Sequence, residues 1–397
     1  MTELLLKDYT ATSCVGHGRL GTLEALRAQR GGLAPCTFER AELDTWTGEV
    51  SGVDDVRLPD KLRRFDCRNN RLAQLALQQD GFADAVAQSI GRYGRRRIGV
   101  FLGTSTSGIL ATEMAYRHRD PTTGALPADF DYEASQNSFS IADYVRQALD
   151  LDGPAAVICS ACSSSAKVFG SARRMMDAGL IDAAVVGGVD SLCLTTLYGF
   201  HALQLTARGP CKPFDTTRDG ISISEAAAFA LLERMPDSLD AGDVTLLGVG
   251  ESSDAYHMSS PHPEGQGART AMLAALEAGG LEPGDIDYIN LHGTGTPSND
   301  NAESRAVASL FGSAVGGSST KGATGHSLGA AGALEAVICS LALQHDFAPG
   351  GINTREIDPE LGIQYLVKNR PGRVTYALSN SFGFGGTNCS LLLGRAG

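Results

Sequence analysis

The chain has 397 residues, of which 43% are hydrophobic and 48 are glycine, a composition typical of a compact α/β protein with many tight turns. The formal net charge of −12 argues against a nucleic-acid-binding protein, and an acidic partner would need a local basic patch. Nine irregularly spaced cysteines indicate free thiols in a reducing compartment and no metal site. No apolar stretch is long enough to cross a membrane, so a cytoplasmic protein is expected.

The pattern of apolar residues predicts alternating strands and helices along the whole chain. Predicted strands cover residues 4–12, 97–102, 155–158, 183–189, 224–232, 246–253, 287–291, 375–379 and 389–393. Predicted helices cover residues 18–28, 60–73, 141–149, 197–203, 267–278, 302–311 and 329–344. Irregular polar segments are expected at residues 30–60 and 117–135.

A strand, a turn of small residues and a buried helix occur twice, around residues 155–176 and again around 318–342. This weak repeat indicates two α/β halves built alike, residues 1–243 and residues 244–397. Alternating strands and helices favour mainly parallel sheets with helices on their faces.

Cys162 lies where the first of these strands turns into a helix. Free backbone N–H groups and the helix dipole there favour the thiolate over the thiol. Small neighbouring residues leave room for a substrate carbonyl, as in the nucleophile elbow of acyl-transfer enzymes. The alternative is an inert buried cysteine. Cys159 completes a C-x-x-C pattern that we interpret as coincidental, because no redox-fold context surrounds it.

Three further motifs concentrate residues suited to catalysis. In NLHGTGTPSN, His292 follows a predicted strand, where open α/β sheets place their ligand chemistry. STKGATGHSLG contains Lys321 and His326, and SNSFGFGGTN contains glycines that let the backbone bend sharply beside Phe382 and Phe384. Each motif alone is weak evidence, since a lone histidine is more often a surface or hydrogen-bonded core residue.

Together with SACSSSA around Cys162, these motifs resemble those of the β-ketoacyl-ACP synthases, in the same order and at compatible distances over essentially the whole chain. The resemblance is to the type I and II elongating enzymes of fatty-acid and polyketide assembly. It implies an α/β thiolase-like fold of two βαβαβαββ halves in a five-layer αβαβα arrangement, and a homodimer. A heterodimer with a related synthase or a chain-length factor is the alternative.

The resemblance also implies a reaction. Cys162 would receive an acyl group from the phosphopantetheine of an acyl carrier protein, with no bound cofactor. His292 and His326, as neutral imidazoles, would donate hydrogen bonds to a malonyl thioester that loses CO₂ to form the attacking enolate. The backbone N–H groups of Cys162 and Phe384 would form a second oxyanion hole, with the ring of Phe384 as a gate.

Other residues receive supporting roles by the same resemblance. Lys321 would act electrostatically on the neighbouring imidazole with Glu335 as its partner, or the two would form a purely structural buried pair. Thr294, Asn380 and Phe382 are supporting candidates. Thr106 matches a position that controls acyl length, and its small polar side chain suggests a polyketide or aryl-polyene pathway rather than saturated fatty acids.

The predicted helix at 60–73 carries the densest basic cluster of the chain. Such a charge run is usually a solvated helix face. Acyl carrier proteins are acidic, however, and the resemblance assigns carrier docking to Lys61 and Arg64, with contributions from Arg63, Arg68 and Arg208.

Two alternatives remain open at this point. A chain-length factor would pair with an active synthase without catalysing the reaction, but such proteins lose the active-site cysteine. A degradative, non-decarboxylating thiolase uses a second cysteine near the C-terminus, and Cys389 lies in the wrong motif for that role.

Overall fold

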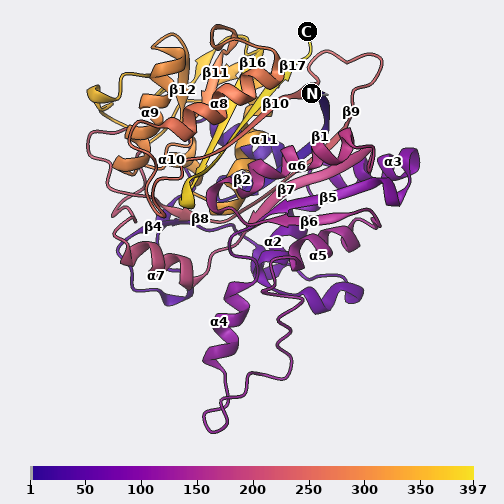
Figure 1. Cartoon of the computed structure of the whole chain (residues 1–397). Coiled ribbons are helices and arrows are strands. Elements are labelled where there is room, and N and C mark those ends of the chain that lie inside the picture. Colours follow the sequence, from indigo (N-terminus) through magenta and orange to yellow (C-terminus); the bar gives the residue numbers. More distant parts are fainter. Residues whose placement is uncertain (1–2) are drawn as a thin grey trace.

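The computed structural model describes residues 3–397 and shows a long sheet with helices outside it and between its two halves (Figure 1). The strand order is β14-β12-β11-β16-β17-β10-β1-β9-β7-β5-β6, and β2 also pairs with β1. In the N-terminal half the strands are β1 (Leu4–Ser13), β2 (Gly16–His17), β5 (Ile98–Gly103), β6 (Ala155–Ile158), β7 (Ala183–Asp190) and β9 (Ala226–Arg234). In the C-terminal half they are β10 (Val244–Ser253), β11 (Tyr288–Asn290), β12 (Gly316–Ser318), β14 (Gln364–Tyr365), β16 (Tyr376–Gly383) and β17 (Thr387–Arg395).

The strand pairing of one half repeats in the other. In the first half β6, β5 and β7 are parallel, whereas β9 is antiparallel to both β7 and β1. In the second half β12, β11 and β16 are parallel, and β17 is antiparallel to both β16 and β10. The sheets are therefore mixed and not mainly parallel as expected, because the last two strands of the second half are joined by a tight turn, which only an antiparallel pair allows.

The helices form three layers around the two halves of the sheet. The middle layer consists of α6 (Ser164–Asp177) and α11 (Ala331–His345), which contact each other and strands from both halves. The outer helices are α2 (Arg68–Leu77), α3 (Phe82–Tyr93) and α5 (Ser140–Ala148) on the first half and α8 (Gln266–Gly279) and α9 (Pro297–Phe311) on the second. This is the five-layer arrangement that the family resemblance implies, and the two histidine motifs lie in the half opposite to Cys162.

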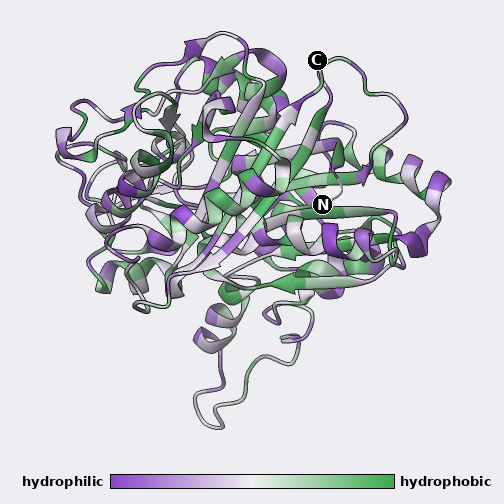
Figure 2. Cartoon of the chain, turned by 45° about the horizontal axis from the view of Figure 1, so that its top comes forward, coloured by the Kyte–Doolittle hydropathy of each residue, from purple (hydrophilic) through white to green (hydrophobic). Residues whose placement is uncertain are grey.

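Residues Leu328–His345 have the length and hydropathy of a membrane-spanning helix, but 89% of this window is buried inside the protein. A helix that is apolar on all sides belongs in a core. Figure 2 shows the same trend, with hydrophobic residues concentrated on the strands and inner helices.

The remaining elements are short or peripheral, and the sequence predicted only some of them. They are α1 (Gly18–Arg27), α4 (Ile109–Arg117), α7 (Leu194–Ala202), α10 (Lys321–Thr324), β3 (Ala34–Pro35), β4 (Trp46–Gly48), β8 (Ile223–Ser224), β13 (Phe347–Ala348) and β15 (Arg370–Pro371). The sequence predicted neither α3 nor α4, and α4 projects from the body with the loop that follows it (Figure 1).

The single helix predicted at residues 60–73 is wrong. A 3₁₀ helix, η3 (Asp60–Phe65), buries Leu62 and Phe65 at the spacing of three that suits that helix type. The chain is then extended at Cys67 before α2 begins. Because of this break, the side chain of Arg68 is buried in the core.

Replacing Gly332 by leucine should destabilise the protein, because a Cβ at this position of α11 would lie 2.8 Å from the Cβ and the backbone N of Ala166 in α6. Overpacking of this kind costs about 1–3 kcal/mol, which should lower the midpoint of urea unfolding. Gly91 in α3 is the matched control, since a Cβ there meets nothing within 4 Å. Gly91→Ala should keep or raise the midpoint. An unchanged midpoint in Gly332→Leu would contradict close packing of the two middle helices.

Candidate active site

Cys162 lies in a short 3₁₀ turn, η5 (Ala161–Ser163), between strand β6 and helix α6. Ala161 has a φ of +52°, a strained conformation for a residue with a Cβ and one that often marks a functional site. The Ser164 hydroxyl donates to the Ala161 carbonyl and accepts from the Ser160 N–H, which holds the turn in place. The cysteine side chain is buried at the bottom of a cavity.

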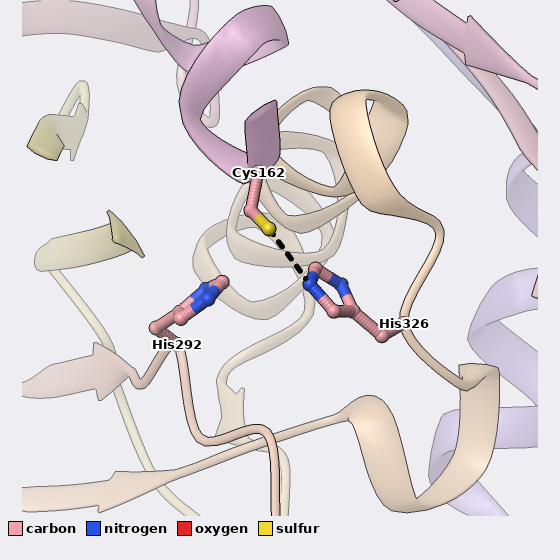
Figure 3. Close-up of side chains that lie close together, drawn as sticks. All are labelled: Cys162, His292 and His326. Atoms are coloured by element: carbon pink, nitrogen blue, oxygen red, sulfur yellow. Dashed lines mark hydrogen bonds between the residues drawn. The ribbon is translucent and has the colours of Figure 1, made fainter. Parts of the chain in front are cut away.

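His292 and His326 reach the same cavity from the second half of the chain. His292 follows β11, and His326 lies between α10 and η7 (Leu328–Ala330), with its backbone paired to residues 222 and 224. Nε2 of His326 is 3.1 Å from Sγ of Cys162, and the two rings stand nearly perpendicular with centroids 5.3 Å apart. Figure 3 shows both rings directed at the sulfur.

Burial sets the resting protonation states of the three groups. It raises the pKa of the Cys162 thiol to about 11, although the charge of Lys321 and a hydrogen bond from the Phe384 N–H oppose the rise. Burial and then Lys321 hold the pKa of His292 and of His326 well below the ordinary value. Both imidazoles are therefore neutral, and the cysteine is a thiol at rest. Burial therefore opposes the thiolate that the helix N-terminus was expected to favour.

Lys321 is buried and makes contacts that fit both of its predicted roles. Its ammonium forms an ion pair with Glu335 and donates to the carbonyl of His292 at 2.5 Å. It also lies 3.3 Å from Nδ1 of His292. Because an ammonium group only donates, Nδ1 accepts and the proton of the neutral ring is on Nε2.

The loop after β16 closes the cavity beside Cys162. The 3₁₀ turn η9 (Phe384–Gly386) places the Phe384 N–H at the sulfur, and its ring packs on Phe200 with centroids 5.6 Å apart. Thr387 and Ser160 join this loop to the cysteine turn through a hydrogen bond of 2.9 Å. Phe382 also lines the cavity, 6.0 Å from the ring of His292.

The other supporting candidates have well-defined positions. Thr294 lines the cavity, and its hydroxyl is 2.9 Å from that of Thr296. Asn380 is buried in β16 and donates to Glu303 at 3.2 Å. Thr106 does not line this cavity, since both its hydroxyl and its N–H are bound to Asp190. An acyl pocket at Thr106 therefore stays a prediction.

Sequence reasoning missed two carboxylates on α9 that hold the histidine loop. Glu303 accepts from the N–H groups of His292 and Gly293, both at 2.7 Å. Asp300 accepts from the N–H groups of Thr294 and Gly295. Their spacing of three at the start of a helix, directly after a glycine-rich turn, was the signal that could have found them.

The predicted docking residues divide into exposed and buried ones. Lys61, Arg63, Arg64 and Arg208 are exposed, and Arg63 and Arg64 border a groove beside α4. Arg68 is buried and paired with Glu225 at 2.6 Å, with Asp54 and with Glu49. Arg68 is therefore not one of the docking residues, because its guanidinium is buried and paired with these carboxylates.

The sulfur and the two imidazoles also have a spacing compatible with a metal ion, since their ligand atoms lie within 4.8 Å of one another. Three protein ligands are too few for a structural zinc site and match the number in a catalytic one. The ammonium of Lys321, 3.3 Å from His292 Nδ1, would repel a second cation. The chemistry of the cluster thus favours proton transfer and hydrogen bonding.

A duplicated five-layer fold with one cysteine and two histidines facing each other across the halves defines a condensing enzyme of thiolase-like fold. Residues 60–238 match the N-terminal domain and residues 244–355 the C-terminal domain of the β-ketoacyl synthases. The chain belongs to the β-ketoacyl synthase family.

Individual relatives agree with this assignment. A 3-oxoacyl-[acyl-carrier-protein] synthase 2 from Coxiella burnetii is 32% identical over 94% of this chain and 93% of its own length. The mitochondrial 3-oxoacyl-[acyl-carrier-protein] synthase of Arabidopsis thaliana is 39% identical, but the match spans only 63% of this chain and 58% of that protein. Among solved structures, the ketosynthase ApeO in complex with its chain length factor ApeC from Xenorhabdus doucetiae matches with a TM-score of 0.89 and 37% identity, over 100% of this chain and 98% of that one.

Glu303 should make stability depend on pH. Burial raises its pKa from about 4.5 to about 7, so this group favours the folded state below pH 4.5 and that contribution is lost as the pH rises through 7. In Glu303→Gln this part of the dependence should disappear, so that the melting temperature falls less steeply between pH 4.5 and 7 than in wild type. If the melting temperatures of the two proteins changed with pH in the same way over this range, a buried ionisable Glu303 would be contradicted.

Proposed function

We propose that this chain catalyses the decarboxylative condensation of an acyl group, held on Cys162, with malonyl-ACP to give β-ketoacyl-ACP. The observation that carries the proposal is the convergence of Cys162, His292 and His326, from opposite halves of the chain, at the bottom of one cavity. The division into halves at residues 1–243 and 244–397 is part of the proposal. So is a reducing, cytoplasmic location, which nine free cysteines support.

Acyl transfer begins with the thiol of Cys162. Its proton passes to Nε2 of His326 over 3.1 Å while the sulfur attacks the thioester carbonyl of the incoming acyl-ACP. The bond to the pantetheine sulfur breaks, and that sulfur takes the proton from His326. The Phe384 N–H, which already meets Sγ, and the N–H of Cys162 stabilise the oxyanion of the tetrahedral adduct.

Condensation then uses both histidines as donors. The malonyl C–C bond breaks, CO₂ leaves, and the electron pair forms an enolate whose oxygen lies between the two imidazoles. His292 offers Nε2–H because Lys321 occupies its other nitrogen. Nδ1 of His326 has no hydrogen-bond partner among residues 3–397, so no residue fixes its tautomer. In the first step Nε2 of His326 accepts a proton and passes it on, which leaves the ring proton on Nδ1. Donation from Nε2 in the second step therefore requires that this proton move from Nδ1 to Nε2. The enolate carbon attacks the acyl carbonyl, and the carbon–sulfur bond to Cys162 breaks. The released thiolate takes up one proton from solvent, which restores the thiol.

The cavity suits the arm of a carrier protein. Its lining combines hydroxyl and amide side chains with apolar ones, among them Thr294, Thr296, Ser259, Asn299, Phe200 and Leu205. Hydroxyl and amide groups match the amides of phosphopantetheine, so no bound cofactor is needed beyond this substrate arm. The exposed basic residues of η3 and Arg208, which follows Leu205 by three positions, supply charge for an acidic carrier.

A dimer is part of the proposal. Strand β6 forms one edge of the sheet, and its residues are only half-buried, so its backbone can pair with another chain. A second copy of this chain is the partner proposed, and a chain-length factor is the alternative that the ApeO–ApeC complex favours. The retained Cys162 and both histidines argue against this chain being the non-catalytic member. The thiolase alternative lacks its second cysteine, because Cys389 is buried in β17 and does not line the cavity.

Incubation with acyl-ACP and malonyl-ACP should give an acyl adduct on Cys162 and an extended β-ketoacyl-ACP, both detected by intact mass. Cys162→Ala should give neither product. His292→Ala is the matched variant and should still form the adduct. Its activation barrier for turnover should rise by about 3–4 kcal/mol, because one oxyanion donor is lost. If wild type forms no adduct with any acyl chain, alone or mixed with a related partner synthase, the catalytic proposal fails.

Reversing a docking charge should weaken carrier binding without affecting chemistry. Arg64→Glu should raise KM for acyl-ACP by a few-fold at low salt, with kcat unchanged, and the difference should shrink at high salt because exposed charges are screened. Arg373→Glu, an exposed residue of the C-terminal half, is the control and should leave KM unchanged. If both variants changed KM for acyl-ACP equally, η3 would not be part of the docking surface.

A further inference from the structure

A buried carboxylate, Asp190, lies at the end of β7 beside the active site, and the mechanism above does not use it. Its side chain has no exposed surface. No lysine or arginine in residues 3–397 lies within salt-bridge distance of it. A buried charge without a counter-ion is costly, so it persists only where hydrogen bonds replace the lost water.

Asp190 accepts five hydrogen bonds. The loop after β5 provides four of them to Oδ1: the hydroxyl of Thr104 at 2.7 Å, the N–H of Ser105 at 2.7 Å, and the N–H and hydroxyl of Thr106, both at 2.9 Å. The fifth comes to Oδ2 from the N–H of Gly329 in η7 at 2.6 Å. Asp190 therefore joins a loop of the first half to a turn of the second half.

Both segments are neighbours of the reacting groups. Ser105 approaches the carbonyl of Ala161, the residue before Cys162, at 3.4 Å. Gly329 follows His326 by three residues, and Leu328 between them has a φ of +49°. The absence of a side chain at Gly329 is required here, because a Cβ would lie 2.8 Å from Oδ2 of Asp190.

The hydroxyl groups of Thr104 and Thr106 donate to Asp190, because each of them already accepts a hydrogen bond from a backbone N–H. That of Thr104 accepts from the N–H of Ser107, and that of Thr106 accepts from the N–H of Ser191. All five groups thus point protons at the carboxylate, which matches an ionised acceptor. Burial raises the pKa of Asp190, and these donors oppose that rise.

We propose that Asp190 is a positioning residue of the condensing reaction, whose carboxylate clamps the loop after β5 to η7 and so holds His326 at proton-transfer distance from Cys162. The inference rests on the proposed function. The negative charge also acts on the thiol: together with Glu335 it raises the pKa of Cys162, whereas Lys321 lowers it, and the two neighbouring histidines are neutral.

Asp190→Asn is the most direct test, because it keeps the size of the side chain and removes the charge. An amide has one acceptor oxygen, so its NH₂ must face either Gly329 or the loop after β5, donor against donor. The clamp then loosens on one side. We expect kcat to fall by up to about 100-fold, as for a small misplacement of catalytic groups, with little change in KM for acyl-ACP.

The second readout is alkylation of Cys162 by iodoacetamide, followed by peptide mass spectrometry between pH 7 and 10. Loss of the negative charge should move this profile to lower pH, so that alkylation at pH 8 becomes faster although turnover is slower. This measurement needs no turnover, so it reports the charge of Asp190 independently of the proposed function, which fails only if wild type forms no acyl adduct. Wild-type turnover in Asp190→Asn would overturn the clamp, and an unchanged alkylation profile would overturn the effect of its charge on the thiol.

Two further variants complete the test. Glu233→Gln is the control, since this buried carboxylate lies at the opposite end of the β7–β9 pair, where Glu233 faces Ala183 and Ala226 faces Asp190. It should change neither the alkylation profile nor kcat. Thr106→Val removes one donor and keeps the charge, and Asn69 still accepts from the Ser191 N–H. It should slow turnover without moving the alkylation profile. If Asp190→Asn does not fold, wild-type turnover in Thr106→Val overturns the inference.

Discussion

The close packing of α6 against α11 between the two halves of the sheet is the contact on which the active site depends. Gly332 of α11 lies against Ala166 of α6, where a Cβ would come within 2.8 Å, and the Ala333 N–H donates to the Ser165 hydroxyl at 2.9 Å. Only small side chains allow two backbones to approach in this way. The cysteine precedes one of these helices and a histidine precedes the other, so their close approach brings both groups to one cavity.

Electrostatics then decides what the converged groups can do. A single buried ammonium, Lys321, faces Glu335 on one side and His292 on the other. Its charge helps to keep both imidazoles neutral, and it fixes the tautomer of one of them while leaving the other free. One histidine is thereby a permanent donor, whereas His326 can both accept and donate. The structural and the functional interpretations of Lys321 are therefore compatible, because the same ammonium makes both sets of contacts.

Much of the candidate site was predictable from local patterns, and its limits have physical causes. The motifs around Cys162, His292, Lys321 and His326 are contiguous stretches of small and polar residues next to apolar strands, so they could be found in the sequence, and the resemblance to a family then implied their roles. Glu303 was missed although its position three residues after Asp300, at a helix start behind a glycine-rich turn, could have indicated it, because the local pattern does not show that the carboxylate is buried. Arg68 was misassigned for the reverse reason, since a basic residue in a charge run gives no sign that a break in the helix turns it inward.

By itself the sequence determined the alternation of elements and the internal repeat, because these follow from residue type and short-range periodicity, whereas the candidate reacting groups were assigned by their resemblance to a family. Tertiary structure alone decided the mixed pairing of the sheets, the protonation of Cys162 and the clamp at Asp190. Each of these depends on burial or on contacts between segments far apart in the chain, and burial changes the charge state of a group without changing its neighbours in sequence. Cys162 is the clearest case: its position at a helix start favours the thiolate, whereas burial raises the pKa of its thiol.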